Sequence, residues 1–246
     1  MSSSPGEAAV RPQVILKAAL SLDGYIDDRG DGRLLLSSPE DRAEVEALRA
    51  GVDAILVGAE TLRRDDPRLV IQTESLRVSR AKSGASPDPI KVTITSSGAL
   101  DPGLAFFRAG EGQKLVYASP SVAAALEERS AGFAEVIPLE VASSALEFLL
   151  EDLSRRGVQR LLVEGGGSLL AQFLATGLFD QVRLAIAPLV LGARGRVPVA
   201  RGSYQLFARS ELALSTVRAV GGMIVQELRN LSSGQSSRQS YPPNAN

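Results

Sequence analysis

The sequence predicts an α/β fold, in which helices flank a mostly parallel central sheet and an antiparallel hairpin lies at the C-terminal end. Over most of the chain, short apolar runs that suit buried strands alternate with helical segments, which is typical of parallel strands joined by helices. From Gln181 onward, strand-like segments follow one another without long helices, and Gly221-Gly222 supplies a tight turn. The chain has 246 residues, 44% of them hydrophobic, which suffices for one domain, placed at residues 14–230.

The first half of that domain predicts four buried strands, at residues 14–20, 53–57, 90–94 and 114–118. A helix begins after Ser38, the expected N-cap, because Pro39 suits the first helical position and two acidic residues follow it; it ends near Gly51. A second helix follows Gly58. Residues 75–89 are rich in Ser, Arg, Pro and Gly and predict a surface loop.

The second half predicts a helix at 119–129, a helix capped by Ser143 that ends at Gly157, and a helix that follows three glycines and ends at Thr176. The helix after Ser143 carries an apolar stripe of Leu146, Leu149, Leu150 and Leu153. Strands are expected at 160–163, 181–187, 211–220 and 223–228. We expect residues 1–13 to be a flexible N-terminus and the polar residues 231–246 to be a disordered tail.

The composition excludes several kinds of chemistry. The chain contains no Cys and no His, which excludes thiolate nucleophiles, Ser-His-Asp triads and metal sites built on either residue, so we expect no metal and favour chemistry that a cofactor performs. A net charge of −1 gives no case for a nucleic-acid or acidic-membrane partner. No apolar run reaches the roughly 18 residues that cross a bilayer, and the start lacks a secretory signal, so we expect a cytoplasmic protein.

Two glycine turns between a strand and a helix are candidate ligand sites. One lies at Gly58 and the other at 164–168, and both are expected at the carboxyl ends of strands, where open α/β sheets bind ligands. Glycine lets a ligand approach the backbone, and the helix N-terminus offers free N–H groups to a phosphate. Taken alone, each turn fits a purely structural need equally well, and the second is not a G-x-G-x-x-G motif.

Two charged residues stand next to apolar strands. Glu164 ends the strand before the three glycines, where burial of a carboxylate is costly without a partner. Lys17 lies inside an apolar strand; the alternative to a functional position is an edge strand from which its chain reaches solvent. The acidic segment 65–69 and the pair Asp23-Gly24 read as ordinary turns in isolation.

In this order, the segments resemble the reductase family of riboflavin biosynthesis. The resemblance covers residues 14–228 and rests on LKAALSLDG at 16–24, on LRA at 48–50 with DAILVG at 53–58, Thr61 and DDPRL at 65–69, and on LVEGGGSLL at 162–170 followed by Asp180 and Ala187-Pro188. It implies a dihydrofolate-reductase-like fold, a homodimer, and NADPH-dependent reduction of the ribosyl chain of a 5-phosphoribosylamino-pyrimidine to the ribityl form.

The resemblance also implies functions for individual residues. We expect contacts with NADPH from Ala19, Thr61, Asp65, Ser96, Gly166, Gly167, Ser168, Leu169 and Leu170. Arg49, Leu69 and Glu164 would face the substrate. As a hypothesis, Lys17 donates the proton during opening of the ribose ring, while Glu164 holds the ribose hydroxyls and stabilises positive charge near the reacting nitrogen.

The chain departs from the family pattern at the substrate pocket. Arg33-Leu34-Leu35 stands where bacterial members have Ser-x-Trp, and Gln72 stands where the family often has an Arg that meets the substrate phosphate. Arg33 and Arg68 are candidate replacements. The His and Cys zinc ligands of a fused deaminase are missing, so both the diaminopyrimidinone and the aminouracil remain possible substrates.

Three further questions stay open at this point. Arg63 and Arg64 are the candidates for recognising the phosphate that distinguishes NADPH from NADH. A reductase of the same fold that acts on another substrate, such as a pterin, is one alternative function. A nucleotide-binding protein without catalysis is the other.

Overall fold

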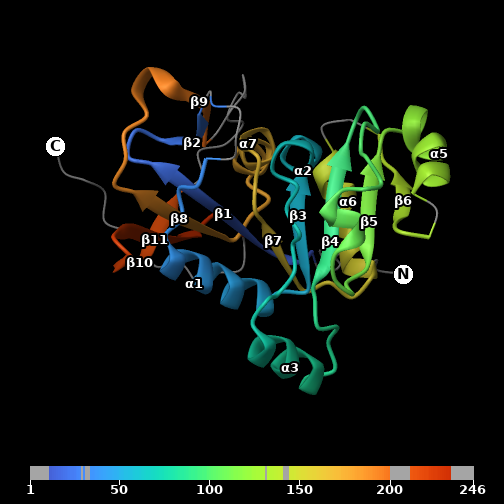
Figure 1. The fold of residues 1–246 in the computed structure, drawn as a ribbon, viewed down its shortest axis with the longest axis horizontal. Coiled ribbons are helices and arrows are strands. Elements are labelled where there is room, and N and C mark those ends of the chain that lie inside the picture. Colours follow the sequence, from blue (N-terminus) through green and yellow to red (C-terminus); the bar gives the residue numbers. More distant parts are fainter. Residues whose placement is uncertain are drawn as a thin grey trace, which may run out of the picture.

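A computed structural model describes residues 11–28, 30, 34–130, 132–140, 144–199 and 211–233. Its main feature is a nine-stranded sheet with the order β10-β11-β8-β1-β7-β3-β4-β5-β6 (Figure 1). The strands are β1 (Gln13–Ser21), β3 (Ala54–Gly58), β4 (Ile90–Thr95), β5 (Lys114–Ala118), β6 (Glu135–Pro138), β7 (Arg160–Val163), β8 (Gln181–Ala187), β10 (Leu212–Val220) and β11 (Met223–Asn230). Within this sheet, as far as the structure describes it, only the pairings of β10 with β11 and of β11 with β8 are antiparallel, which confirms the predicted fold class.

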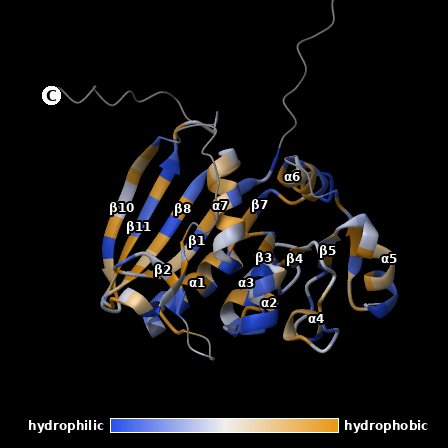
Figure 2. Ribbon diagram, turned by 90° about the horizontal axis from the view of Figure 1, so that it is seen from above, coloured by the Kyte–Doolittle hydropathy of each residue, from blue (hydrophilic) through white to orange (hydrophobic). Residues whose placement is uncertain are grey.

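Helices cover both faces of this sheet (Figure 2). They are α1 (Pro39–Ala50), α2 (Ala59–Asp65), α3 (Glu74–Lys82), α4 (Ala105–Arg108), α5 (Pro120–Arg129), α6 (Ala145–Arg155) and α7 (Gly167–Thr176). Alternate residues of β1 enter different cores: Leu16 packs with α6 and α7, whereas Ile15 packs with α2, α4 and α5. The central parallel strands are therefore buried on both faces, which explains why they are continuous apolar runs.

A second sheet of two strands was not predicted. It pairs β2 (Tyr25–Asp28) with β9 (Gly195–Pro198) in antiparallel orientation beside β1, and the 3₁₀ helix Gly192–Arg194 precedes β9. Both strands are short and carry charged or turn-forming residues, so neither shows a clear period of two. The close packing of Gly195 requires glycine, because a Cβ atom there would lie 2.5 Å from the ring of Tyr25.

The predicted helix boundaries are confirmed where local capping determines them. Ser38 caps α1 by accepting a hydrogen bond of 3.0 Å from the backbone N–H of Asp41, Pro39 is its first residue, and it ends before Gly51. The hairpin between β10 and β11 turns at Gly221 and Gly222, both of which have positive φ. Among the described residues, no helix has the length and apolar content needed to cross a membrane.

The prediction of a surface loop at 75–89 is wrong for its first part, which forms α3. Its composition looks polar, but Arg80 is buried and donates hydrogen bonds to the carbonyls of Ala50 and Val52 at 2.9 and 2.7 Å. These bonds attach α3 to the end of α1 and to the segment after it. A tertiary contact therefore stabilises a helix that the local composition does not favour.

Some predicted features lie wholly or partly outside the described residues. The expected cap Ser143 is one, and α6 begins after Ser144. The expected flexible start and tail also lie outside, except that residues 11–13 are described, with Gln13 already in β1, and residues 231–233 are described.

Candidate active site

A cavity of about 750 Å³ lies at the carboxyl ends of β1, β3 and β7, beside α1, α2 and the start of α7. After β1 the chain crosses over β7 to reach β3, and after β7 it crosses over β1 to reach β8. The two connections thus run in opposite directions over the pair β1 and β7, and the cavity lies outside the carboxyl ends of these strands, where open α/β sheets bind ligands. Residues of the unpredicted small sheet, Ile26, Asp27 and Val197, complete the wall.

The two glycine turns that the sequence singles out are in direct contact. The N–H of Gly58 donates to the carbonyl of Gly165 at 3.0 Å, and the N–H of Glu164 donates to the carbonyl of Leu56 at 3.0 Å. A Cβ atom on Gly166 would lie 3.0 Å from the Thr61 hydroxyl oxygen, and Gly165 has a φ of 121°, which favours glycine. Glycine is needed here so that the two turns form one continuous surface.

Glu164 has a partner that offsets the cost of its burial. Its two carboxylate oxygens each accept a hydrogen bond of 2.6 Å from the guanidinium of Arg49, in a two-point ion pair. The side chains are 9% and 21% exposed, respectively. Burial alone would lower the pKa of Arg49, but the charge and hydrogen bonds of Glu164 raise it. Arg49 therefore remains charged at the cavity wall.

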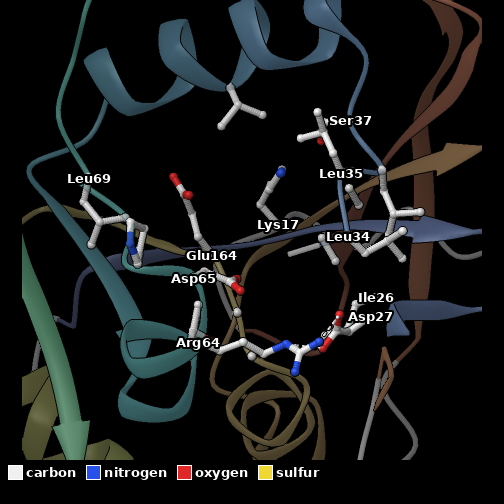
Figure 3. A pocket seen from close by; sticks show the side chains of 18 of the residues that line it. Lys17, Ile26, Asp27, Leu34, Leu35, Ser37, Arg64, Asp65, Leu69 and Glu164 are labelled. Carbon is white, nitrogen blue, oxygen red and sulfur yellow. Dashed lines mark hydrogen bonds and ion pairs between the residues drawn. The ribbon is translucent and has the colours of Figure 1, made fainter. Parts of the chain in front are cut away.

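Lys17 lies in the interior of the sheet. Its strand, β1, is flanked by β8 and β7, so the alternative of a lysine on an edge strand is wrong. Figure 3 shows the Lys17 ammonium and the Glu164 carboxylate pointing into the same cavity. Burial lowers the pKa of Lys17 from its ordinary value, while Glu164 and then Asp41 act in the opposite direction. An amino group of weakened basicity thus shares the cavity with the Glu164 carboxylate.

The acidic segment 65–69 is more than a solvated turn. Leu69 is only 1% exposed and has a φ of 50°, a conformation that is uncommon for a residue with a branched side chain and that often marks ligand sites. The backbone of this segment is anchored to β4, because the Lys91 ammonium donates a hydrogen bond of 2.6 Å to the carbonyl of Arg68. The Asp66 carboxylate accepts a hydrogen bond of 2.7 Å from the N–H of Ala105.

The structure brings most of the expected site residues together. The cavity wall includes Lys17, Ala19, Arg49, Thr61, Asp65, Leu69, Glu164, Gly166, Gly167, Ser168, Leu169 and Leu170. Ser96 is not part of this wall and is exposed after β4. Gln72 and Leu35 lie at the wall, where the sequence departs from the family pattern, and Arg33 lies outside the described residues.

The cavity also contains residues that the sequence did not single out. Asp27 forms an ion pair of 2.7 Å with Arg64, visible in Figure 3, and reaches the cavity because it lies on β2. Arg42 and Glu46 come from the same helix face as Arg49. Spacing along α1 could have identified these two, whereas nothing local predicts that β2 folds over the cavity.

Comparisons with known proteins agree over most of the chain. The family model of the RibD C-terminal domain matches residues 12–225. The protein of Archaeoglobus fulgidus named 2,5-diamino-6-ribosylamino-4(3H)-pyrimidinone 5′-phosphate reductase is 37% identical over 193 residues, which is 78% of this chain and 88% of that protein. The protein of the same name from Methanothermobacter thermautotrophicus is 35% identical over 189 residues, 75% of this chain and 82% of that protein.

A solved structure supports the same fold. The pyrimidine reductase-like protein from Corynebacterium diphtheriae superposes with a TM-score of 0.76 at 21% identity, covering 89% of this chain and 92% of that one. The sheet order, the contact between the two glycine turns, and the match over residues 12–225 lead to one conclusion. The chain belongs to the RibD C-terminal domain family.

Proposed function

We propose that this protein is a reductase of riboflavin biosynthesis that uses NADPH to convert the ribosyl chain of 2,5-diamino-6-ribosylamino-4(3H)-pyrimidinone 5′-phosphate to the ribityl form. The observation that carries the proposal is the placement of Lys17 and Glu164 on one cavity, next to the paired glycine turns. Family membership and the names of the two archaeal relatives support the reaction class.

The paired glycine turns suit a dinucleotide. Gly166 has no side chain of its own, and α7 begins after it with Gly167 and Ser168, which both line the cavity, so the helix N-terminus is placed to offer backbone N–H groups to a phosphate. A bound nicotinamide supplies the hydride. For the extra phosphate of NADPH, Arg63 is the better candidate, because it is exposed and donates a long hydrogen bond of 3.3 Å to the Ala99 carbonyl, whereas Arg64 is engaged with Asp27.

The residues of the chain would then perform acid catalysis and charge stabilisation. Lys17 donates a proton to the ribose ring oxygen as the ring opens, and burial favours this step by weakening its hold on the proton. Glu164 accepts hydrogen bonds from the ribose hydroxyls and stabilises positive charge at the reacting carbon and nitrogen. Arg49 holds that carboxylate in a fixed direction through two hydrogen bonds.

The diaminopyrimidinone is preferred over the deaminated aminouracil because both archaeal relatives carry its name at 35% identity or more. We also propose that the protein acts in the cytoplasm as a homodimer. Support for a dimer comes from exposed apolar side chains on the hairpin, namely Leu214 and Val217 on the edge strand β10 and Ile224 on the neighbouring β11.

The test is to follow the loss of nicotinamide absorbance with each pyrimidine as sole substrate. We expect turnover with NADPH and the diaminopyrimidinone, with slower turnover of the aminouracil and with NADH. Activity with dihydrofolate but neither pyrimidine would contradict the proposed substrate class. Binding of NADPH without oxidation in the presence of either pyrimidine would contradict a catalytic function.

A further inference from the structure

A buried ion pair lies next to Lys17 but outside the cavity wall. Arg183, on β8, is the strand partner of Lys17 in the parallel pairing of β8 with β1. One of its terminal nitrogens donates to Asp41 Oδ1 at 2.8 Å and to Glu44 Oε2 at 2.9 Å, both on α1. Asp41 is fully buried and Arg183 is 6% exposed, whereas Glu44 is one-third exposed.

The ion pair between Asp41 and Arg183 is unfavourable for the stability of the fold. Among the described residues, Asp41 Oδ2 and Arg183 Nη1 have no hydrogen-bond partner, although both atoms are buried. A buried ion pair with incomplete hydrogen bonding does not repay the cost of removing its charges from water. Attachment of α1 to β8 does not by itself require charges, since an apolar pair at the same positions would do it. The presence of the buried charges of Asp41 and Arg183 is therefore not explained by the attachment of α1 to β8.

We infer that Asp41 is a positioning residue that keeps Lys17 protonated, because its carboxylate neutralises the Arg183 guanidinium on the neighbouring strand. The inference rests on the proposed function, in which Lys17 donates a proton. Arg183 ties α1 to β8 but places a positive charge beside Lys17, and the Asp41 carboxylate, which accepts a hydrogen bond from that guanidinium, offsets it. Glu44 contacts the same nitrogen of Arg183 but lies nearer to solvent, where water screens its charge.

The charges around Lys17 support this arrangement. Glu164, at the end of β7, and Asp41, on α1, raise the pKa of Lys17, while burial, Arg183 and Arg49 lower it. On β2, Asp27 is paired with Arg64. Two ion pairs, Arg49 with Glu164 and Arg183 with Asp41, thus act on the pKa of Lys17, and the loss of either carboxylate removes the negative charge that offsets the neighbouring guanidinium.

The chain has only four lysines, Lys17, Lys82, Lys91 and Lys114, so lysine side chains labelled with ¹³C can be titrated individually by NMR in the protein without ligands. Asp41→Asn keeps the shape of the side chain and removes its charge. We expect the titration midpoint of Lys17 to fall in this variant. Glu44→Gln is the matched control, since it removes a carboxylate from the same guanidinium nitrogen, and we expect it to leave the midpoint unchanged.

A second variant should shift the titration midpoint of Lys17 in the opposite direction. Arg183→Gln removes the positive charge beside Lys17, so its midpoint should rise. In turnover assays, the high-pH limb of kcat should move to lower pH in Asp41→Asn and stay in place in Glu44→Gln, with little change in KM for either.

The inference is overturned if Asp41→Asn leaves the Lys17 midpoint unchanged or if Glu44→Gln moves it equally. If Asp41→Asn does not fold, Arg183→Gln decides alone, and an unchanged or lower midpoint refutes the inference. The NMR titration needs no substrate. Failure of the proposed function would instead appear as an absence of turnover in the parent protein.

Discussion

Arg49 on α1 and Glu164 at the end of β7 form a two-point ion pair with hydrogen bonds of 2.6 Å, although 115 residues separate them in the chain. The pair fixes α1 against the carboxyl end of a central strand. It also gives the Glu164 carboxylate one direction, into the cavity that Lys17 shares. Stability and catalysis are therefore expected to depend on the same contact.

Replacement of Arg49 by Leu should destabilise the fold by about 2–4 kcal/mol, because it leaves the Glu164 carboxylate buried without its partner. The double variant Arg49→Leu with Glu164→Gln should recover part of that loss, since no unpaired charge remains. Urea denaturation of the parent, both single variants and the double variant measures this coupling. Additive losses would show that the two side chains do not stabilise each other.

Replacement of Lys17 by Met should lower turnover by about a hundredfold to ten-thousandfold, the range typical for loss of a general acid. Binding of NADPH, measured by calorimetry, should be retained, because the glycine turns are unchanged. Lys17→Arg keeps a positive charge but releases protons far less readily, so it should not restore turnover. Near-normal turnover in Lys17→Met would exclude Lys17 as the proton donor.

Lys91 should hold the loop that carries Leu69. Its ammonium lies buried on β4 and donates to the carbonyls of Arg68, Phe106 and Ala109 at 2.6, 3.3 and 2.6 Å. Lys91→Met leaves these acceptors without a donor, so we expect a loss of about 2–4 kcal/mol in unfolding free energy and a higher KM for the pyrimidine.

Lys114, the strand partner of Lys91 on β5, provides the matched control. It is partly exposed and makes one weak contact of 3.4 Å with a carbonyl. Lys114→Met should change stability by less than about 0.5 kcal/mol. Equal effects of the two substitutions would mean that the three carbonyl contacts of Lys91 are not important.

Asp88 should make stability depend on pH in the acid range. Burial alone would raise the pKa of its carboxyl, but hydrogen bonds from the backbone N–H groups of Ile71 and Glu111 and from Arg77 lower it below 3.8. The unfolded chain therefore binds this proton more readily than the native protein does. The stabilisation is present above the unfolded value and is lost as pH falls through the native one.

Asp88→Asn tests this dependence. We expect it to cost about 2–4 kcal/mol at neutral pH, because the amide cannot accept all three hydrogen bonds. The difference from the parent should shrink as pH falls below about 4, as urea denaturation over a pH series can show. Glu74→Gln is the control: Glu74 also pairs with Arg77 but is 81% exposed, so its loss should have little effect at any pH.

Local sequence patterns predicted the central strands, α1 and the glycine turns, because capping residues and apolar runs determine them within a few residues. They missed α3, which depends on contacts of Arg80 with the end of α1, and the small sheet, whose strands are short and polar. Tertiary contacts stabilise these elements, and such contacts leave no periodic signal.

In the candidate site, too, local sequence predicted some residues, whereas others depend on contacts between distant segments. The sequence singled out Glu164 and Lys17 because burial of a charged side chain in an apolar strand is costly unless the charge is paired or has a function. Their partners were harder to find: Arg49 entered through family resemblance, and Asp41 and Arg183 were not singled out. The pair formed by Asp41 and Arg183 joins residues 142 positions apart, and only the strand order brings them beside Lys17. Pairing between distant segments is not visible in a single sequence.

The most direct test of the proposed reaction is isotope transfer. The enzyme would be incubated with the diaminopyrimidinone ribosyl phosphate and with NADPH that carries deuterium at the hydride position of the nicotinamide, and the product would be analysed by mass spectrometry and NMR. We predict a product with one deuterium at the former anomeric carbon, now part of a ribityl chain, and almost no transfer in Lys17→Met. Oxidation of NADPH without deuterium in a ribityl product would contradict the account.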